Sequence, residues 1–415
     1  MEDKLMQRKI GSSIAKGMVA GLKGATFTLV GATALSVAFL SVVGSASAKD
    51  IKIGVLYPIS GGGAIYGGPA MRGHDLAVEE INAAGGVLGS NFVTAARDSK
   101  INPAAAAAAA KELITKEGVN VILGGLASSV GLAISEVARQ EKVIYIATIP
   151  KTIKMTTSKL HPYVFRTASN TDFEGDAMAQ IVKKVNGKKL CDIQLDYAYG
   201  HDLGDGIAKA LPKHAPNANI VIKLRPKLGA TDFNAYITQI MGAGCETVVS
   251  GLWGNHFVNF AKQAAPFGFF SNHVYITGGE IASHEVASKL GGDYPDNVWS
   301  NTYELWYHSP TDAHKKFQAR LSKKAGTEAT AMWPVLAYNG VMLYAAAVEK
   351  AGSTDAEKVI KALEGLTIDT PMGKLTIDAK SHQANTGQFW GPMKKQSGQA
   401  YRRMDPVTFV PAPSN

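Results

Sequence analysis

A glycine-rich stretch near the start of the chain is the first candidate for a binding loop. Residues 51–56 form an apolar, β-branched run typical of a buried strand, and Ser60-Gly61-Gly62-Gly63 follows before helical spacing begins. Such a strand–loop–helix unit directs unpaired backbone N–H groups at the space above the strand end, where a small anion or carboxylate binds. Tyr66 adds an aromatic hydroxyl to this loop.

This loop matches neither of the nucleotide-binding motifs with which it could be confused. No lysine follows the glycines as a P-loop requires, and the sixth position counted from Gly61 is Tyr66 rather than the glycine of a dinucleotide fingerprint. Glycines alone would also fit an ordinary turn between a strand and a helix. The tyrosine favours a small organic ligand over a polyphosphate.

Two later loops add groups that could contact an anion. Ser128 and Ser129 follow one predicted strand and begin a predicted helix, so their hydroxyls either cap that helix or contact a carboxylate. Ile149 and Lys151 lie in the loop after the next predicted strand. The ammonium group of Lys151 is either a solvated loop charge or a partner for a carboxylate.

The second half of the chain places aromatic and acidic side chains at equivalent positions. Tyr199 and Trp253 follow two predicted strands, and Glu280 follows a third. Each of them, taken singly, could be a packing residue of a loop. Ligands of open α/β sheets bind outside the carboxyl ends of the parallel strands. The repeated position of these side chains therefore predicts one shared pocket, formed together with the loops of the first half.

These residues require a framework of alternating strands and helices. Short apolar runs alternate with longer stretches of helical spacing in two series, and extended segments at 161–166 and 297–306 separate and end them. Such alternation predicts parallel sheets covered by helices and connected by right-handed crossovers.

Three helix starts can be predicted from local signals. Pro69 suits the first turn of the helix after the glycine loop, and Asn102-Pro103 opens an alanine-rich helix over 104–116. The helix after Tyr199 is predicted over 204–211. These starts place Tyr66 and Tyr199 in loops.

Residues 1–48 have the pattern of a secretory signal peptide. Basic residues precede an apolar run of small residues, and Ala46-Ser47-Ala48 forms an A-x-A cleavage site. A membrane anchor is the alternative, but the modest hydrophobicity and the cleavage site favour removal after Ala48. We therefore expect an exported, periplasmic protein. The net charge of the full chain is +9, and removal of five basic and two acidic residues with the signal peptide leaves +6. The basic residues are scattered without runs of Lys or Arg, which indicates solubility rather than nucleic-acid binding.

The chain has two cysteines, Cys191 and Cys245, and each precedes a predicted strand. In adjacent parallel strands the thiols would lie side by side, and export permits disulfides. The sequence does not decide between a disulfide and two free thiols. No spacing of His, Cys, Asp and Glu resembles a metal site, so we expect no metal and no cofactor. Because neither a G-x-S-x-G motif nor a Ser-His-Asp order is present, we expect no enzyme activity.

Several motifs together resemble those of the exported solute-binding proteins of ABC transporters, in particular the leucine/isoleucine/valine- and amide-binding family. These motifs are IGVLYPISG, IYGGPAMRGHDLAVEEINAAGG, VILGGLASS, DYAYG, and ALEGL with TPMGKLTID. The resemblance implies the type I periplasmic binding fold, an α/β fold of two doubly wound parallel-sheet lobes joined by three crossover segments. The ligand cleft lies between the lobes, which close by hinge motion. By this resemblance residues 49–169 and 302–378 form lobe 1, and residues 170–301 and 379–415 form lobe 2.

The resemblance also implies roles for individual residues. Tyr66 and Ser128 match positions that hold a ligand carboxylate, Tyr199 and Trp253 match aromatic positions of the second lobe, and Glu280 matches the acid that pairs with a ligand ammonium group. The chain departs from the amino-acid binders of this family at residues 149–152, because those binders have a small loop rich in Ala and Thr at this position. Lys151 in this segment would add a carboxylate contact or narrow the pocket, which counts against branched-chain amino acids and leaves an aromatic or other carboxylate, or an amide, as the ligand.

The function implied is capture of a small amino acid, or of a related carboxylate or amide, and its delivery to the membrane subunits of an ABC permease. We expect a monomer. The alternative is an exported ligand-sensing receptor module of the same fold for an aromatic or short carboxylic acid. A neighbouring permease gene would distinguish the two, and turnover of a bound ligand would indicate an enzyme instead.

Overall fold

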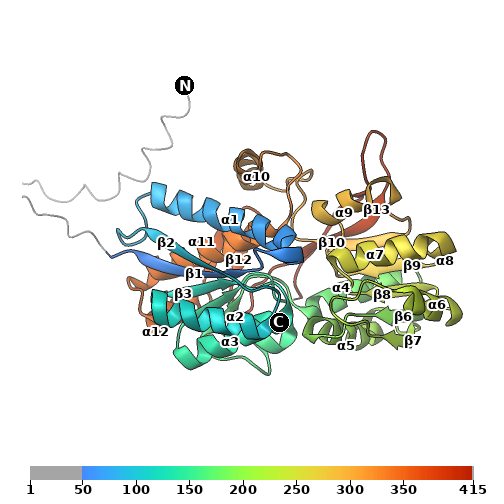
Figure 1. Ribbon diagram of the computed structural model, residues 1–415, viewed down its shortest axis with the longest axis horizontal. Helices are drawn as coiled ribbons and strands as arrows, with labels where there is room; N and C mark the ends of the chain where they lie inside the picture. The colour runs from blue at the N-terminus through green and yellow to red at the C-terminus, as the bar shows by residue number, and fades with distance from the viewer. Residues whose placement is uncertain (1–48, 414–415) are drawn as a thin grey trace, which may run out of the picture. The chain divides into compact units, whose positions relative to one another are not determined.

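A computed structural model describes residues 49–413, so the predicted signal peptide lies outside the described residues. Two main sheets dominate this part of the chain (Figure 1). We call the first sheet with its helices the first lobe, and the second sheet with its helices the second lobe.

The first sheet is parallel and has the order β2-β1-β3-β4-β5. Its strands are β1 (Ile51–Tyr57), β2 (Phe92–Asp98), β3 (Val121–Gly124), β4 (Ile144–Ala147) and β5 (Val164–Arg166). Strand β1 is buried along nearly its whole length, as expected for a strand covered on both faces. The strand order reverses between β1 and β3, which makes this the switch point where ligands of doubly wound sheets bind.

The second sheet repeats this order in its parallel part, β7-β6-β8-β9-β10, and continues through antiparallel strands. Its strands are β6 (Lys189–Ile193), β7 (Asn219–Leu224), β8 (Thr247–Ser250), β9 (Val274–Thr277), β10 (Val298–Thr302), β13 (Gln388–Lys394), β14 (Arg403–Met404) and β15 (Thr408–Val410). The second switch point therefore lies between β6 and β8. A separate hairpin consists of β11 (Thr367–Thr370) and β12 (Gly373–Thr376).

Helices cover both faces of each sheet. Figure 1 shows α1 and α11 on one side of the first sheet and α2 and α3 on the other, and the apolar clusters of the lobe divide in the same way. The helices of the first lobe are α1 (Ala64–Ala83), α2 (Pro103–Glu112), α3 (Ser128–Glu141), α10 (Asp312–Ala325), α11 (Trp333–Ala351) and α12 (Ala356–Leu363).

In the second lobe, α4 and α5 pack on one face of the sheet and α6, α7, α8 and α9 on the other. Their bounds are α4 (Thr171–Lys184), α5 (Ala198–His214), α6 (Asn234–Gly242), α7 (Gly254–Ala264), α8 (Phe269–Asn272) and α9 (His284–Leu290). The predicted class of two doubly wound α/β lobes is therefore confirmed.

The chain passes between the lobes three times: after β5, after β10 and after β12. Three such passages match the three expected crossover segments. The lobe boundaries themselves, at 169/170, 301/302 and 378/379, stay a prediction. The segment expected to be an extended crossover at 297–306 contains β10, which pairs with β9 and β13 as an inner strand of the second sheet.

Two helices begin earlier than predicted. Helix α1 starts at Ala64, so Pro69 lies inside it and Tyr66 is helical rather than part of a loop. Because proline has no N–H group, the Ile65 carbonyl receives no helical hydrogen bond from Pro69. Helix α5 starts at Ala198, which places Tyr199 in its first turn. The predicted start at Pro103 is confirmed, with the Asn102 side chain accepting a hydrogen bond from the Ala105 N–H at 2.9 Å.

Cys191 and Cys245 form a disulfide, with their Cα atoms 5.7 Å apart. Cys191 lies on β6 opposite Val248 of β8, and Cys245 lies just before β8. The parallel pairing of these two strands therefore brings the two cysteines together. The sequence left a disulfide and two free thiols as alternatives, and the structure has the disulfide.

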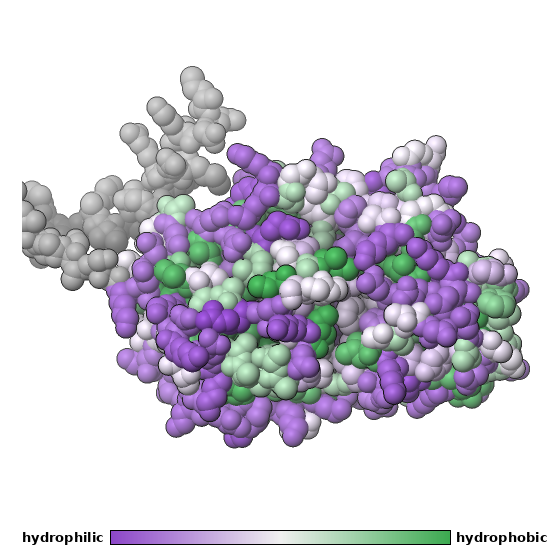
Figure 2. Space-filling model, in the orientation of Figure 1, coloured by the Kyte–Doolittle hydropathy of each residue, from purple (hydrophilic) through white to green (hydrophobic). Residues whose placement is uncertain are grey.

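The surface carries apolar side chains in small, separate groups. Figure 2 shows hydrophilic residues over most of the visible face, with hydrophobic ones scattered among them. The large hydrophobic residues that are exposed come from different elements: Ile59, Leu88, Val93, Val221, Met241, Phe267 and Phe409. No helix within residues 49–413 is both long and apolar enough to cross a membrane.

Candidate functional site

A cavity lies where the carboxyl ends of the strands of both lobes meet. Its volume is about 30 Å³, which suits a small solute rather than a peptide or a nucleotide. Both lobes contribute to its lining, which consists of Leu126, Ala127, Ser128, Ile149, Lys151, Tyr197, Tyr199, Trp253, Glu280 and Trp333. Trp333 begins helix α11, and every other lining residue comes from the loop after a strand or from the first turn of the helix that follows it.

The first wall is the beginning of helix α3. Ala127 occupies the N-cap position, and no side chain caps the helix. Ser128 is 2% exposed, and its Oγ accepts hydrogen bonds from the backbone N–H groups of Lys151 at 3.3 Å and Thr152 at 3.1 Å. The Ser128 proton is therefore free to donate into the cavity, beside helix amides that have no partner within the helix. Ser129 lies in the same turn but does not line the cavity.

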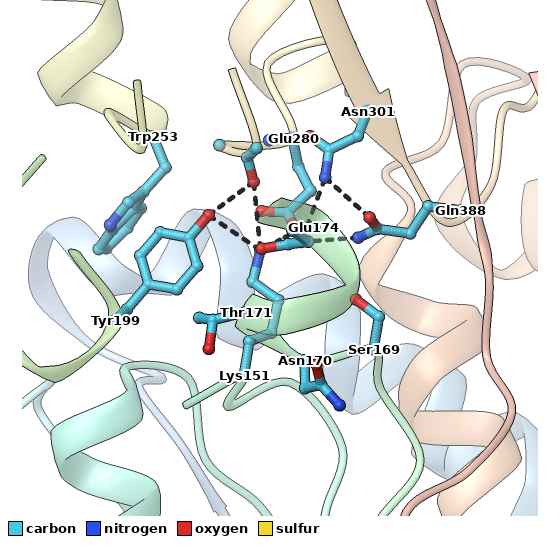
Figure 3. Close-up of polar contacts among 12 residues, drawn as sticks. Lys151, Ser169, Asn170, Thr171, Glu174, Tyr199, Trp253, Glu280, Asn301 and Gln388 are labelled. Atoms are coloured by element: carbon cyan, nitrogen blue, oxygen red, sulfur yellow. Dashed lines mark hydrogen bonds and ion pairs between the residues drawn. The ribbon is translucent and has the colours of Figure 1, made fainter. Parts of the chain in front are cut away.

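On a second side of the cavity, the ammonium group of Lys151 is surrounded by hydrogen-bond acceptors, which we call the ammonium cage (Figure 3). They come from Glu174, Tyr199, Gly278 and Glu280. Lys151 comes from the loop after β4 and is 7% exposed. Its Nζ donates to Glu174 Oε1 at 2.8 Å, to the Gly278 carbonyl at 3.2 Å and to Glu280 Oε1. It also lies 3.4 Å from the Tyr199 hydroxyl and 4.5 Å from the centre of the Tyr199 ring, a cation–π distance.

The carboxylate of Glu174 anchors this cage from helix α4. Its Oε1 also accepts hydrogen bonds from Asn301 Nδ2 at 3.2 Å and from Gln388 Nε2 at 2.8 Å, as Figure 3 shows. Asn301 lies on β10 and Gln388 on β13, so three distant segments meet at one carboxylate. Among the described residues, Glu174 Oε2 is buried without a hydrogen-bond partner.

Burial and mutual contact perturb the acid–base behaviour of the cage. Burial is the main cause that raises the pKa of Glu280 to about 8; Lys151 opposes this shift, and the negative charge of Glu174 adds to it. Burial alone would lower the pKa of Lys151, but the carboxylates of Glu174 and Glu280 outweigh it and raise this pKa above its ordinary value. Lys151 therefore stays charged at neutral pH, and the carboxyl group of Glu280 takes up a proton at a higher pH than an ordinary glutamate does.

Aromatic rings form the remaining walls. Trp253 Nε1 donates to the Tyr197 hydroxyl at 3.0 Å, so the Tyr197 proton is available to another acceptor. Tyr66 does not line the cavity; it packs edge-on against Trp253 at 5.4 Å and against Trp333 at 5.5 Å between ring centres. Tyr66 thus holds two cavity walls in place rather than facing the cavity itself.

Side chains of the two lobes contact one another across the cleft. Besides the Lys151 cage and the Tyr66–Trp253 pair, Thr152 donates to Asp202, and Lys154 Nζ pairs with Asp202 Oδ1 at 2.8 Å. Trp333 Nε1 also donates to the Glu285 carboxylate. The cleft is therefore closed, and its polar contacts can form only in this closed arrangement.

The structure brings together most of the side chains singled out in the sequence. Six of the eight predicted site residues line the cavity: Ser128, Ile149, Lys151, Tyr199, Trp253 and Glu280. Tyr66 packs behind them, and Ser129 lies at the start of α3 away from the cavity. Assignment of a ligand contact to each of these residues stays a prediction.

Several residues that border the cavity or hold Lys151 in place were not predicted from the sequence. Tyr197 and Trp333 border the cavity, and Glu174, Asn301 and Gln388 hold the ammonium cage. Tyr197 stands two residues before Tyr199 at the same strand end, so it could have been included with that signal. Glu174 is an acid in the first turn of a helix, where acids are common for other reasons.

Comparison with known proteins places the chain in a family. A family model described as periplasmic binding protein matches residues 50–397. Leu/Ile/Val-binding protein homolog 3 of Brucella melitensis is 30% identical over 82% of this chain and 91% of the relative. The leucine-, isoleucine-, valine-, threonine-, and alanine-binding protein of Pseudomonas aeruginosa is 27% identical over 82% of this chain and 89% of the relative.

Solved structures share the fold at low sequence identity. A solute-binding protein of an ABC transporter from Rhodopseudomonas palustris HaA2, in complex with p-hydroxybenzoic acid, has a TM-score of 0.80 at 24% identity and covers 88% of this chain and 98% of that one. The branched-chain amino acid transporter substrate-binding protein LivJ from Streptococcus pneumoniae, in complex with isoleucine, has a TM-score of 0.73 at 24% identity, with 87% and 99% covered. With two doubly wound lobes, a closed cleft at their strand ends and a family match over most of its length, this chain belongs to the periplasmic binding protein family.

Proposed function

We propose that this protein captures a small carboxylate in the cavity between its lobes and delivers it to the membrane subunits of an ABC transporter. The observation that carries the proposal is the start of helix α3, where Ser128, the first residue of the helix, borders the cavity and no side chain caps the helix. A helix N-terminus attracts anions because its first N–H groups lack partners and the helix dipole is positive there.

The rest of the cavity suits an apolar body attached to that carboxylate. Tyr197, Tyr199, Trp253 and Trp333 form most of its walls, together with the aliphatic side chain of Ile149. Aromatic rings bury much apolar area and retain a polar edge for orientation. The ligand therefore binds with its carboxylate at α3 and its apolar part among the rings.

The relatives support this ligand chemistry. The Pseudomonas relative is named for leucine, isoleucine, valine, threonine and alanine, and the Rhodopseudomonas structure contains p-hydroxybenzoic acid. Both ligand types join a carboxylate to a small apolar group, which agrees with the anion site and the aromatic walls of this cavity.

The lining residues also favour binding over catalysis. The part of the cavity lining that the structure describes contains neither cysteine nor histidine, and the Ser128 oxygen is occupied by two backbone N–H groups. A nucleophile needs an adjacent base that removes its proton. We therefore propose a non-catalytic protein that acts as a monomer in the periplasm after removal of residues 1–48.

A ligand screen tests the proposal. The chain from Lys49 is heated with benzoate, 4-hydroxybenzoate, 4-methylpentanoate, leucine, and the uncharged analogues benzamide and glucose, and hits are measured by calorimetry. We expect at least one carboxylate to stabilise the fold by about 2.7 kcal/mol at a hundredfold excess over its Kd, because only the folded state binds it. Stabilisation by the uncharged compounds alone would contradict the proposal.

A further inference from the structure

We propose that Lys151 fills the ammonium position of the cleft with the chain's own ammonium group, so that the protein selects carboxylates without an α-amino group and rejects α-amino acids. This inference rests on the proposed function, which it narrows to one class of ligand. It makes Lys151 a specificity-determining residue.

An α-amino acid needs two sites in one cavity, one for its carboxylate and one for its ammonium group. The acceptors that could take an ammonium group are the Glu280 carboxyl, the Gly278 carbonyl and the Tyr199 ring face, with Glu174 behind them. All of them contact Lys151 Nζ. An ammonium group has three N–H donors, and the two carboxyls and the carbonyl satisfy all three of Lys151.

The polar groups that remain around the cavity are donors. Ser128 and Tyr197 each accept hydrogen bonds through their oxygen and keep a proton to donate, and the Trp253 N–H is engaged with Tyr197. A second ammonium group would therefore have to share the acceptors that Lys151 already uses, and it would lie beside the buried positive charge of Lys151. A buried charge without a partner is strongly disfavoured, so this arrangement discriminates against amines by repulsion as well as by missing contacts.

Lys151 is tied to both lobes, which keeps it in this position. Its backbone N–H donates to Ser128 of the first lobe, while its ammonium group bonds to Glu174 and Glu280 of the second. The same loop carries Lys154, which is exposed and pairs with Asp202 across the cleft without lining the cavity. Lys154 is therefore a matched control: it is a lysine of the same loop with an ion pair to the same lobe.

Matched ligand pairs measure the selectivity directly. Leucine and 4-methylpentanoate differ only in the α-amino group, as do phenylalanine and 3-phenylpropanoate. For the wild-type protein we expect calorimetry to give at least tenfold tighter binding of the amine-free member of a pair. Equal or tighter binding of the amino acid would overturn the inference and leave the proposed function intact. Failure of every carboxylate to bind would instead refute the proposed function.

Substitution of the lysine should invert the preference. Lys151→Ala empties the ammonium position, so the ratio of amino-acid to amine-free affinity should rise at least tenfold, whereas Lys154→Ala should leave this ratio unchanged. Because Lys151→Ala leaves Glu174 and Glu280 unpaired, Lys151→Ala/Glu174→Gln is measured in parallel as a variant with fewer buried charges. An unchanged ratio in the folded variants, or an equal change in Lys154→Ala, would show that Lys151 does not set the selectivity.

Discussion

Closure of the cleft depends on a glycine that leaves room for a side chain of the opposite lobe. Gly254 begins helix α7 with φ +55°, and a Cβ atom added there would lie 1.7 Å from the Tyr66 hydroxyl oxygen. Tyr66 is 3% exposed and held edge-on between Trp253 and Trp333, so its ring cannot swing aside. Gly254→Ala should therefore obstruct the closed arrangement.

The free-energy cost of Gly254→Ala has two parts, one that is the same in the open and the closed cleft and one that exists only in the closed cleft. An alanine in the left-handed region costs about 1–2 kcal/mol in the open and the closed form alike, so it lowers stability without changing affinity. The collision with Tyr66 exists only in the closed form, and overpacking of this kind costs about 1–3 kcal/mol. Ligand binding should weaken by a factor of about 5–150, since 1.4 kcal/mol corresponds to a factor of ten.

Gly268→Ala is the matched control for Gly254→Ala. Gly268 lies in the same lobe at φ +62°, but a Cβ added there meets its nearest atom, Asn272 Nδ2, at 3.9 Å. Both variants should lose similar stability in urea unfolding, while only Gly254→Ala should lose affinity in calorimetry. Adding Tyr66→Phe to Gly254→Ala should restore part of the affinity, because the nearest ring atom is then Cζ at 2.9 Å. Wild-type affinity for Gly254→Ala, or an equal loss for Gly268→Ala, would refute this reasoning.

Three further predictions concern the cavity wall, the disulfide and the acid cage. Trp253→Ala should weaken ligand binding about 30-fold in fluorescence titrations, because the edge contact of this ring with Tyr66 and its contact with the ligand contribute about 1 kcal/mol each. Trp299 is a half-buried tryptophan on β10 outside the cavity, and Trp299→Ala should leave ligand binding unchanged. A collapsed melting transition of Trp253→Ala would show that Trp253 is a packing residue instead. Reduction of Cys191–Cys245, which are separated by 54 residues, should cost about 4 kcal/mol in urea unfolding, and unchanged stability would contradict the structural role of this bond. The stability of the protein should fall as pH rises from the ordinary glutamate range through about 8, because Glu280 in the folded state keeps a proton that the unfolded chain releases. Glu280→Gln should flatten this dependence of the melting temperature on pH. A dependence that is unchanged in Glu280→Gln would exclude this carboxyl group as its source.

Much of the framework follows from local sequence signals. The alternation of apolar runs and helical spacing predicted two series of parallel strands covered by helices, and the family resemblance implied two doubly wound lobes. The rule that ligands bind at strand carboxyl ends placed Ser128, Lys151, Trp253 and Glu280 in one pocket, and the structure brings them together in one cavity. The position of Tyr66 was predicted less well, because proline usually begins a helix and α1 instead starts five residues before Pro69.

The contacts of Lys151 could not be predicted in the same way. The Glu174 carboxylate that binds Lys151 also accepts hydrogen bonds from Asn301 on β10 and Gln388 on β13. Asn301 and Gln388 lie 127 and 214 positions from Glu174 in the sequence. Local periodicity contains no information on such pairings, which arise only when both lobes are folded and closed. The sequence therefore left two alternatives for Lys151, and the structure shows a buried ion pair with Glu174 and Glu280 in place of a solvated charge.

The most direct test of the account is a crystal structure of the wild-type protein with the tightest-binding acid of the screen. We predict that the ligand carboxylate bonds to Ser128 and the first amides of α3, that its apolar part lies against Trp253, and that Lys151 remains between Glu174 and Glu280. A ligand ammonium group bonded to Glu280 with Lys151 displaced, or a ligand carboxylate paired with Lys151 away from α3, would contradict it.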